Sequence, residues 1–373
     1  MTVTVRSFAK INLGLRIGAL RPDGFHELRT VYQTIVLHDI IRVRVERGTG
    51  IEILCEDPRV PKDESNTCYR IVERAMDALK PRGRVIIEIE KRLPVQGGLG
   101  GASGNAVSAL LALERALKKK LPGPERLRIA AEVGSDLPLF LVGGTVLGVG
   151  HGEEVYPLPD LPAVPCVVAL PKIAVSTPKA FAEWDAGMGR NYESCHSESA
   201  SADEESAVQQ QARKAGSSGD RSPLGMTRLS GPSKLTGFTK SDRMLEFSRM
   251  IAAWLSAQPK AKAGKGLSGV SARGRGRAET PLLDLVRTGI ENDFEQVVFP
   301  QYPELREVKG VLERAGACYA SLSGSGSAVY GLFGSRVNAE KAAAKIRETG
   351  VEARVTTTLT RRQYGNKFLV SSF

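Results

Sequence analysis

The sequence predicts an α+β fold in two domains, with one long insertion inside the second domain. The chain has 373 residues, 42% of them hydrophobic, and this length favours two cores over one. Short β-type runs alternate with amphipathic helical runs in both halves. Between them lies a stretch rich in Ser, Gly, Gln and charge, which is typical of a segment without a packed core. We expect domains at 1–155 and 156–373, and the insertion at about 190–279.

Hydrophobic periodicity defines the expected elements of the first half. Alternating or continuous apolar runs indicate strands, whereas apolar residues three and four positions apart indicate helices. The apolar stretch "LFLVGGTVLGVG" (139–150) is interpreted as a buried hairpin. The predicted strands cover 3–9, 34–37, 41–46, 50–54, 85–89 and 166–171, and the predicted helices cover 68–79, 106–118 and 126–132.

The second half begins with the insertion, and order is expected to return near residue 280. The segment 190–240 is predicted to be largely disordered, while apolar spacing in 241–258 indicates a helix docked on the protein. The other predicted elements are a helix with a break over 280–299, helices over 302–317 and 338–350, a strand–turn–strand unit over 318–333, and a strand over 351–359.

The net charge of +11 is concentrated in one place. Six of the eleven excess charges lie in 259–277, a Gly- and Ala-rich stretch without acidic residues. Such a stretch is usually a solvated segment, although it can also serve as an arm that binds nucleic acid. The remaining surface is mildly basic, which also suits an anionic small substrate.

Cysteine and histidine usage argues against a disulfide framework and against zinc. The five cysteines are scattered and form no C-x-x-C, and there are only four histidines. No apolar run approaches the length of a membrane helix. The N-terminus alternates apolar and polar residues, so we interpret it as a strand and not as a signal peptide. A reducing cytoplasm is the expected compartment.

The stretch "PVQGGLGGASGNA" (94–106) is the clearest functional signal. Five of the eight residues from Gly97 to Gly104 are glycine, and helix formers follow at once. Successive glycines allow backbone N–H groups to line one concavity, and a helix N-terminus adds unpaired N–H groups and partial positive charge. The stretch is therefore either a phosphate cradle or a flexible loop. It lacks the lysine of a P-loop and the third glycine of G-x-G-x-x-G, and the chain lacks the protein-kinase motifs.

Three further stretches carry polar residues in unusual places. Lys10 interrupts an apolar strand, Asp136 precedes a very apolar run, and "SGSGSAV" (323–329) is a second Gly/Ser loop. Taken singly, these are a solvent-facing lysine, a turn or capping aspartate and a tight hairpin.

Taken together, the four stretches resemble the GHMP family of small-molecule kinases. The central motif of that family is similar to P-x-x-x-G-L-G-x-[SA]-S, which this chain matches from Pro94 onward. The opening "FAKINLGLRIGALRPDGFHELRTVYQTIVLHDII" (8–41) resembles the 4-diphosphocytidyl-2-C-methyl-D-erythritol kinases within it, as do "VSTPKAF", "ENDFE" and "SLSGSGSAVYGLF". The similarity covers about 1–184 and 280–360. Homoserine or mevalonate kinase activity, or nucleic-acid binding through 259–277, are the alternatives.

The resemblance implies a fold and a reaction. The N-terminal domain would be ribosomal-protein-S5-like and the C-terminal domain ferredoxin-like. The enzyme would transfer the γ-phosphoryl group of ATP, with Mg²⁺, to the 2-hydroxyl of 4-diphosphocytidyl-2-C-methyl-D-erythritol in the non-mevalonate isoprenoid route. It implies a monomer or homodimer whose partner is this small molecule, without membrane or nucleic acid.

The resemblance also implies site residues. Asp136 would be the base, Lys10 would keep it ionised and stabilise developing charge, and Ser103 would be the hydroxyl nearest to Mg²⁺ or phosphate. The expected nucleotide-binding residues are Pro94, Gly97, Gly98, Leu99, Gly100, Gly101, Ala102, Ser103, Gly104 and Asn105. The residues expected to bind the phosphoryl acceptor, called acceptor residues below, are Asn12, Phe25, His26, Thr177 and Phe181. The second Gly/Ser loop contributes Ser323, Gly324, Ser325 and Gly326.

Within this pattern each acceptor residue has an implied role. His26 would hydrogen-bond the cytosine edge, Phe25 and Phe181 would sandwich the ring, Thr177 would contact the ribose and Asn12 the methylerythritol portion. Three positions depart from the usual pattern. Phe25 stands where tyrosine is common, Gly104 where a serine is common, and Gln96 where a smaller residue is common.

Overall fold

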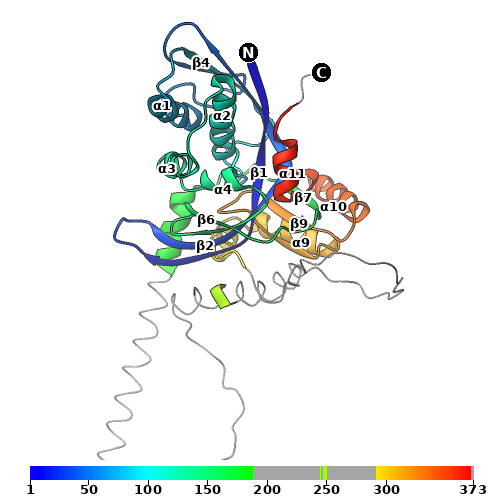
Figure 1. The fold of residues 1–373 in the computed structure, drawn as a ribbon. Coiled ribbons are helices and arrows are strands. Elements are labelled where there is room, and N and C mark those ends of the chain that lie inside the picture. Colours follow the sequence, from blue (N-terminus) through cyan, green and yellow to red (C-terminus); the bar gives the residue numbers. More distant parts are fainter. Residues whose placement is uncertain (188–243, 245–246, 250–290, 371–373) are drawn as a thin grey trace, which may run out of the picture.

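A computed structural model of the chain describes residues 1–187, 244, 247–249 and 291–370, which form two β-sheets with helices packed on them (Figure 1). The predicted disordered segment 190–240, the basic run 259–277 and most of the predicted helix 241–258 lie outside the described residues. Within that last segment, the described residues Met244 and Phe247 are buried.

The first sheet is built on one long hairpin. Its strand order is β3-β4-β2-β5-β6, with β1 paired to β2. The predicted strand 3–9 is the start of β1, and 34–37 and 41–46 are both parts of β2, because antiparallel pairing continues from Thr2 opposite Arg44 to Leu20 opposite His26. The bounds are β1 Thr2–Leu20, β2 His26–Glu46, β3 Ile51–Cys55, β4 Arg84–Glu90, β5 Thr145–Val149 and β6 Glu154–Pro157.

Three helices of the first half are confirmed, and one prediction is wrong. The stretch 139–150 is not a hairpin: Pro138–Val142 forms the short helix α4, which ends at two glycines with positive φ, and only Thr145–Val149 is a strand. Helix α2 begins at Gly101, five residues earlier than the predicted 106–118, so the end of the glycine stretch is already helical. The other helices are α1 Thr67–Leu79, α2 Gly101–Leu117 and α3 Gly123–Val133.

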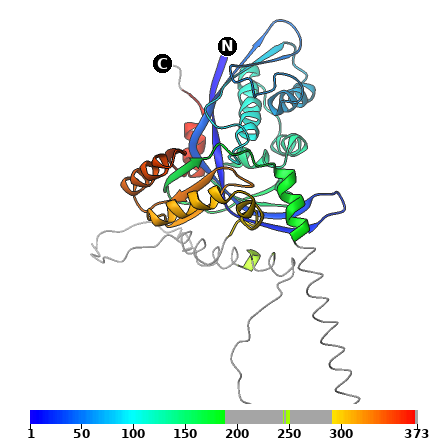
Figure 2. The same ribbon diagram turned by 180° about the vertical axis from the view of Figure 1, so that it is seen from behind.

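The second sheet is antiparallel, in the order β10-β7-β9-β8. Helices α9 and α10 contact it (Figure 2). The described part of the predicted helix 280–299 becomes helical only at Glu295, and the C-terminal helix α11 was not predicted from the sequence. The bounds are β7 Pro165–Leu170, α8 Glu295–Gln301, α9 Pro303–Arg314, β8 Tyr319–Leu322, β9 Val329–Leu332, α10 Arg336–Glu348, β10 Glu352–Thr357 and α11 Arg361–Phe368.

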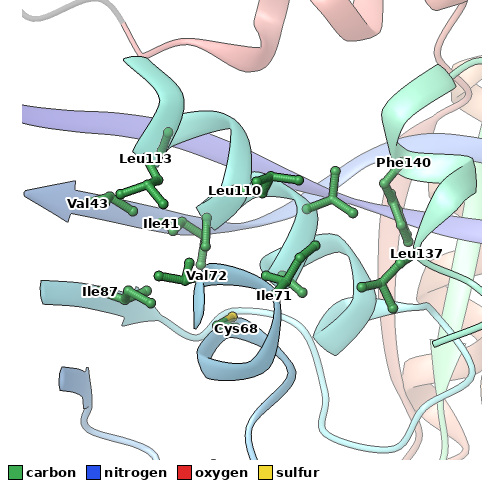
Figure 3. Packing of buried hydrophobic residues seen from close by; sticks show 14 of the residues in the cluster. Ile41, Val43, Cys68, Ile71, Val72, Ile87, Leu110, Leu113, Leu137 and Phe140 are labelled. Atoms are coloured by element: carbon green, nitrogen blue, oxygen red, sulfur yellow. The ribbon is translucent and has the colours of Figure 1, made fainter. Parts of the chain in front are cut away.

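Apolar cores fill each half and the seam between them. In the first half, helices α1 and α2 pack on the sheet, and Leu137 and Phe140 close one end (Figure 3). A second core joins the halves, because residues of β1 such as Ile11 and Leu13 pack with Val168 of β7 and Tyr330 of β9. The strand β1 is therefore buried between the two sheets, and polar residues on it lie in a dry environment.

A buried ion pair also fastens the second half to β1. The Arg16 guanidinium donates to Asp293 Oδ1 at 2.8 Å, and Asp293 Oδ2 accepts the Ile17 N–H at 2.9 Å. Asp293 has no solvent exposure. Glu291 also contacts Arg16, at 3.3 Å, but its side chain is 67% exposed.

We expect Asp293→Ala to lower the free energy of unfolding by about 3 kcal/mol, because it leaves a buried guanidinium without its main partner. Glu291→Ala is the control, and we expect it to cost less than about 1 kcal/mol because the lost pair is exposed. Urea unfolding measures both. Equal costs for the two variants would contradict the assigned role of Asp293.

Candidate active site

The glycine stretch forms a loop whose carbonyl groups face the protein. The Gly97 carbonyl accepts the Ala328 N–H at 3.2 Å, the Gly98 carbonyl accepts the Ser323 hydroxyl at 2.9 Å, and the Leu99 carbonyl accepts the Lys10 N–H at 2.9 Å. The backbone N–H groups from residue 98 to residue 103 donate to no described residue. Such a set of unpaired donors is what an anion-binding loop requires.

The two Gly/Ser loops touch each other across the seam. Gly98 has a φ of +72°, and a Cβ placed on it would lie 2.1 Å from the Ser323 carbonyl oxygen and 2.9 Å from that of Gly326. Only glycine fits here, both for its φ and for the space. The second loop is held in turn by Asn292, whose amide donates to the carbonyls of Leu322 and Gly324.

Helix α2 starts directly from the loop. Its N-cap is Gly100, which has φ 67° and no side-chain cap, so the first N–H groups of the helix remain available. Gly104 faces the other way: a Cβ there would lie 3.0 Å from both the Phe8 carbonyl and the Ser7 hydroxyl. A hydroxyl expected at residue 104 would therefore point at β1 and not at a bound nucleotide.

A cavity of about 340 Å³ lies over this loop and helix start. Ten nucleotide-binding residues were expected, and all except Gly104 line it. Asn105 is only 3% exposed and its side-chain oxygen has no hydrogen-bond partner, so the wall of the cavity contains an unsatisfied acceptor. The unpaired N–H groups are donors, which suit the acceptor oxygens of a polyphosphate, whereas the Asn105 oxygen would suit a hydroxyl group or a cation.

Lys10 and Asp136 lie close together beside the glycine loop. Lys10 Nζ lies 3.4 Å from Asp136 Oδ2 and donates to Asn12 Oδ1 at 2.8 Å. Lys10 is 3% exposed, and Gly100 is tight against its side chain. In this pair the ammonium of Lys10 is buried, while the carboxylate of Asp136 remains partly accessible from solvent.

Tyr32 completes this group and was not singled out in the sequence. Its hydroxyl donates to Asp136 Oδ1 at 2.8 Å, which leaves Oδ2 on the Lys10 side. Burial, and then the Asp136 carboxylate, raise the pKa of Tyr32 well above its ordinary value. The phenol therefore stays protonated and donates to the carboxylate. Tyr32 lies in a strand whose sequence alternates apolar and polar residues, and nothing in that pattern marks it as a site residue. Its role becomes visible only because the fold places Asp136 beside it.

A second cavity, of about 760 Å³, opens on the other side of this group. It shares three wall residues with the first cavity: Gly98, Gly100 and Ser103. All the expected acceptor residues line it, together with Lys10 and Asp136. The two cavities therefore meet at the glycine loop, beside the Lys10–Asp136 pair.

The far end of the second cavity is aromatic. Phe181 stacks on His26 with ring centroids 5.2 Å apart and an interplanar angle of 3°. His26 Nδ1 lies 3.2 Å from the Gly18 carbonyl, and Nε2 lies 3.1 Å from Asp185 Oδ2. Because a carbonyl only accepts, Nδ1 carries a hydrogen.

Phe25 is 57% exposed and packs on His151, with centroids 5.1 Å apart. Each of the two phenylalanines faces a histidine, and the stacking of a cytosine ring between Phe25 and Phe181 stays a prediction.

Thr177 joins the second loop to this cavity. Its hydroxyl lies 2.7 Å from that of Ser325. His151 was not predicted as a site residue; it lies 2.7 Å from the Ser135 hydroxyl, next to Asp136. Among the described residues there is no group of three or more potential metal ligands, and none of their helices is long and apolar enough to cross a bilayer.

Two family models match the chain and define its class. The model for the GHMP kinases N terminal domain matches residues 66–144, and the model for GHMP kinases C terminal matches residues 279–352. The first match contains the glycine loop and Asp136, and the second contains the second Gly/Ser loop. The protein therefore belongs to the GHMP kinases.

Curated relatives narrow the class. The chain is 35% identical over 334 residues to a 4-diphosphocytidyl-2-C-methyl-D-erythritol kinase of Solibacter usitatus, which covers 89% of this chain and 81% of the relative. It is 32% identical to the kinase of the same name from Acaryochloris marina, over 92% of this chain and 91% of that relative. This chain belongs to the 4-diphosphocytidyl-2-C-methyl-D-erythritol kinase family.

Solved structures agree on the fold. A crystal structure of 4-(cytidine 5'-diphospho)-2C-methyl-D-erythritol kinase superposes with a TM-score of 0.61 and 26% identity, over 95% of this chain and 98% of that one. A homoserine kinase from Cytophaga hutchinsonii gives the same TM-score at 17% identity, over 96% and 95% of the two chains. The fold is thus shared by kinases with different names, and the acceptor must be argued from the residues of the cavity.

We expect Gly98→Ala to separate the two loops, because the added methyl would overlap the Ser323 carbonyl and the φ is unfavourable. The KM for ATP should rise at least about tenfold and the melting temperature should fall. Gly123→Ala is the control, since a Cβ there meets nothing within 4 Å. An unchanged KM for ATP in a folded Gly98→Ala protein would contradict the described loop contact.

Proposed function

We propose that this chain transfers the γ-phosphoryl group of ATP to the 2-hydroxyl of 4-diphosphocytidyl-2-C-methyl-D-erythritol, a step of the non-mevalonate isoprenoid route. The observation that carries the proposal is the meeting of two cavities at Gly98, Gly100 and Ser103, with Lys10 and Asp136 beside the junction. In-line phosphoryl transfer needs such a junction, with donor on one side and acceptor on the other.

The glycine loop would hold the phosphates of ATP. Its unpaired N–H groups and the N-terminus of α2 supply donors and partial positive charge without side-chain bulk. Mg²⁺, which the proposal includes, would neutralise charge on the phosphates when bound, and Ser103 is the hydroxyl that lines both cavities.

Asp136 would accept the proton of the acceptor hydroxyl. An alcohol is a weak acid, so the carboxylate helps chiefly in the transition state, when the proton becomes labile. The buried Lys10 ammonium lies 3.4 Å from Asp136 Oδ2, where it would stabilise negative charge that develops at the junction. Tyr32 restrains the carboxylate through Oδ1, so that Oδ2 stays directed toward Lys10.

The aromatic end of the larger cavity would hold the cytidine. His26 Nε2 and the Asp185 carboxylate lie side by side at this end, and we assign the cytosine edge to these polar atoms. Phe181 and Phe25 supply flat faces for stacking, and Thr177 lies where the second loop reaches this cavity. Asn12, held between Lys10 and Thr30, would contact the methylerythritol portion.

The remaining expectations belong to the same proposal. They are a division of the chain at residue 155, a monomer or homodimer, and action in a reducing cytoplasm. The four cysteines within the described residues are free thiols, which is the state that such a compartment maintains.

The test of the acceptor is a coupled ADP-release assay on the full chain. We expect turnover with 4-diphosphocytidyl-2-C-methyl-D-erythritol and at most background turnover with homoserine or mevalonate, neither of which has a cytosine to occupy the His26 end. Equal or faster ADP release with homoserine or mevalonate would remove the acceptor assignment while leaving the kinase class intact.

We expect Asp136→Asn and Lys10→Met to lower kcat by about 100-fold or more with near-native unfolding curves, because each removes a group acting on the transferred proton or charge. Tyr32→Phe should lower kcat by about tenfold, since it removes one hydrogen bond to the base. Steady-state kinetics and urea unfolding measure these effects. Near-normal turnover in Asp136→Asn would show that no carboxylate base acts there.

A further inference from the structure

Asp39 of β2 is a fully buried carboxylate that the reaction itself does not use. It has no solvent exposure and accepts four hydrogen bonds. The donors are the Arg92 N–H and the Leu93 N–H, both to Oδ1 at 2.7 Å, and Lys91 Nζ at 2.6 Å and Asn105 Nδ2 at 2.9 Å, both to Oδ2. A carboxylate with this many donors is fixed in both position and orientation.

These bonds connect the two ends of the glycine loop. Residues 91–93 lead into the loop, and Asn105 lies in the first turns of α2, just after it. We propose that Asp39 is the positioning residue of the nucleotide loop: one carboxylate fixes the spacing between the end of strand β4 and the start of helix α2. The inference rests on the proposed function, because it assigns ATP phosphates to that loop.

The middle of the loop is anchored separately. Gly97 and Gly98 are held by the second Gly/Ser loop, and Leu99 by the backbone of Lys10. With its ends on Asp39 and its middle on the other half of the protein, the loop is fixed along its length while its N–H groups stay unpaired. Preorganised donors of this kind bind an anion without the unfavourable entropy change of ordering the loop on binding.

Lys91 gives the same carboxylate an electrostatic role. Its side chain is 8% exposed, it lines the nucleotide cavity, and its ammonium lies 3.3 Å from the Cβ position of Gly101, at the start of α2. A cation at a helix N-terminus is unfavourable on its own. Asp39 compensates for this, and so holds a positive charge beside the loop that receives phosphates.

Asp39→Asn tests the proposal because the amide cannot replace the carboxylate. If the amide oxygen faces Arg92 and Leu93, its NH₂ group opposes the Lys91 ammonium; if it turns, its NH₂ group opposes the two backbone N–H groups. In either orientation at least one donor at the entry to the loop loses its acceptor. We expect the Kd of a non-hydrolysable ATP analogue and the KM for ATP each to rise about tenfold, with the KM for the cytidyl acceptor within twofold of the original.

The matched control is Glu114→Gln. Like Asp39, Glu114 is a buried acid, although it lies in α2; it is 3% exposed. It accepts hydrogen bonds from the Leu121 N–H and the Arg126 guanidinium, at 2.8 Å each. It lies about 14 Å along the helix axis from Asn105. We expect Glu114→Gln to lower stability while leaving the Kd of the ATP analogue within twofold. Asn105→Ala, which removes a single tether, provides a milder variant should Asp39→Asn fail to fold; its expected rise in Kd is about threefold or more.

Three outcomes overturn the proposal. One is an unchanged Kd for the analogue in folded Asp39→Asn, or in Asn105→Ala if the former does not fold. Another is an equal weakening in Glu114→Gln. The third is a parallel rise in the KM for the acceptor. The analogue binds without acceptor present, so a wrong acceptor assignment leaves this test intact, whereas a wild-type chain that does not bind the analogue refutes the proposed function as well.

Discussion

The contact between Gly98 and Ser323 is the constraint on which the site depends. It brings the backbones of two loops together, from the two halves of the chain, at a spacing that admits no side chain on residue 98. The loop carbonyls are used in this contact and in the bond to Lys10, while the N–H groups of residues 98 to 103 donate to no described residue. The same contact that joins the halves therefore also fixes the part of the loop whose N–H groups would, in the proposed function, donate to phosphate.

Strand β1 extends this arrangement to the reacting groups. It is buried between the two sheets, its backbone at Lys10 holds the glycine loop, and its side chain at Lys10 meets Asp136. Lys10 thus contacts the loop through its backbone and holds its buried ammonium beside the partly accessible carboxylate of Asp136. Strand β2 contributes in the same way, because the Tyr32 hydroxyl donates to Asp136 and Asp39 accepts from Asn105 at the start of α2. Two neighbouring strands supply most of the fixed polar groups of the site.

The sequence predicts the parts of this account that depend on local pattern or on a family motif. Regular apolar spacing located α1, α3 and β4, and motifs located the glycine loop, Lys10 and Asp136. The prediction for 139–150 is wrong because a short apolar run does not distinguish helix from strand, although Pro138 and the glycines after Val142 indicate a short helix and its end. Tyr32 has no local signal, and Asp39 lies in the opening stretch 8–41 that resembles the family but without a stated role, since the partners of both residues lie far along the chain and are brought near only by the fold.

The most direct test of the central claim is NMR of the full chain with ¹⁵N-labelled glycine, titrated with a non-hydrolysable ATP analogue. The account predicts that the amide protons of Gly98, Gly100 and Gly101 move downfield at saturation, as unpaired N–H groups acquire phosphate acceptors. Gly123, which lies on α3 outside both cavities, should stay unchanged. Saturable binding that leaves the resonances of Gly98, Gly100 and Gly101 in place while other glycines shift would contradict the account.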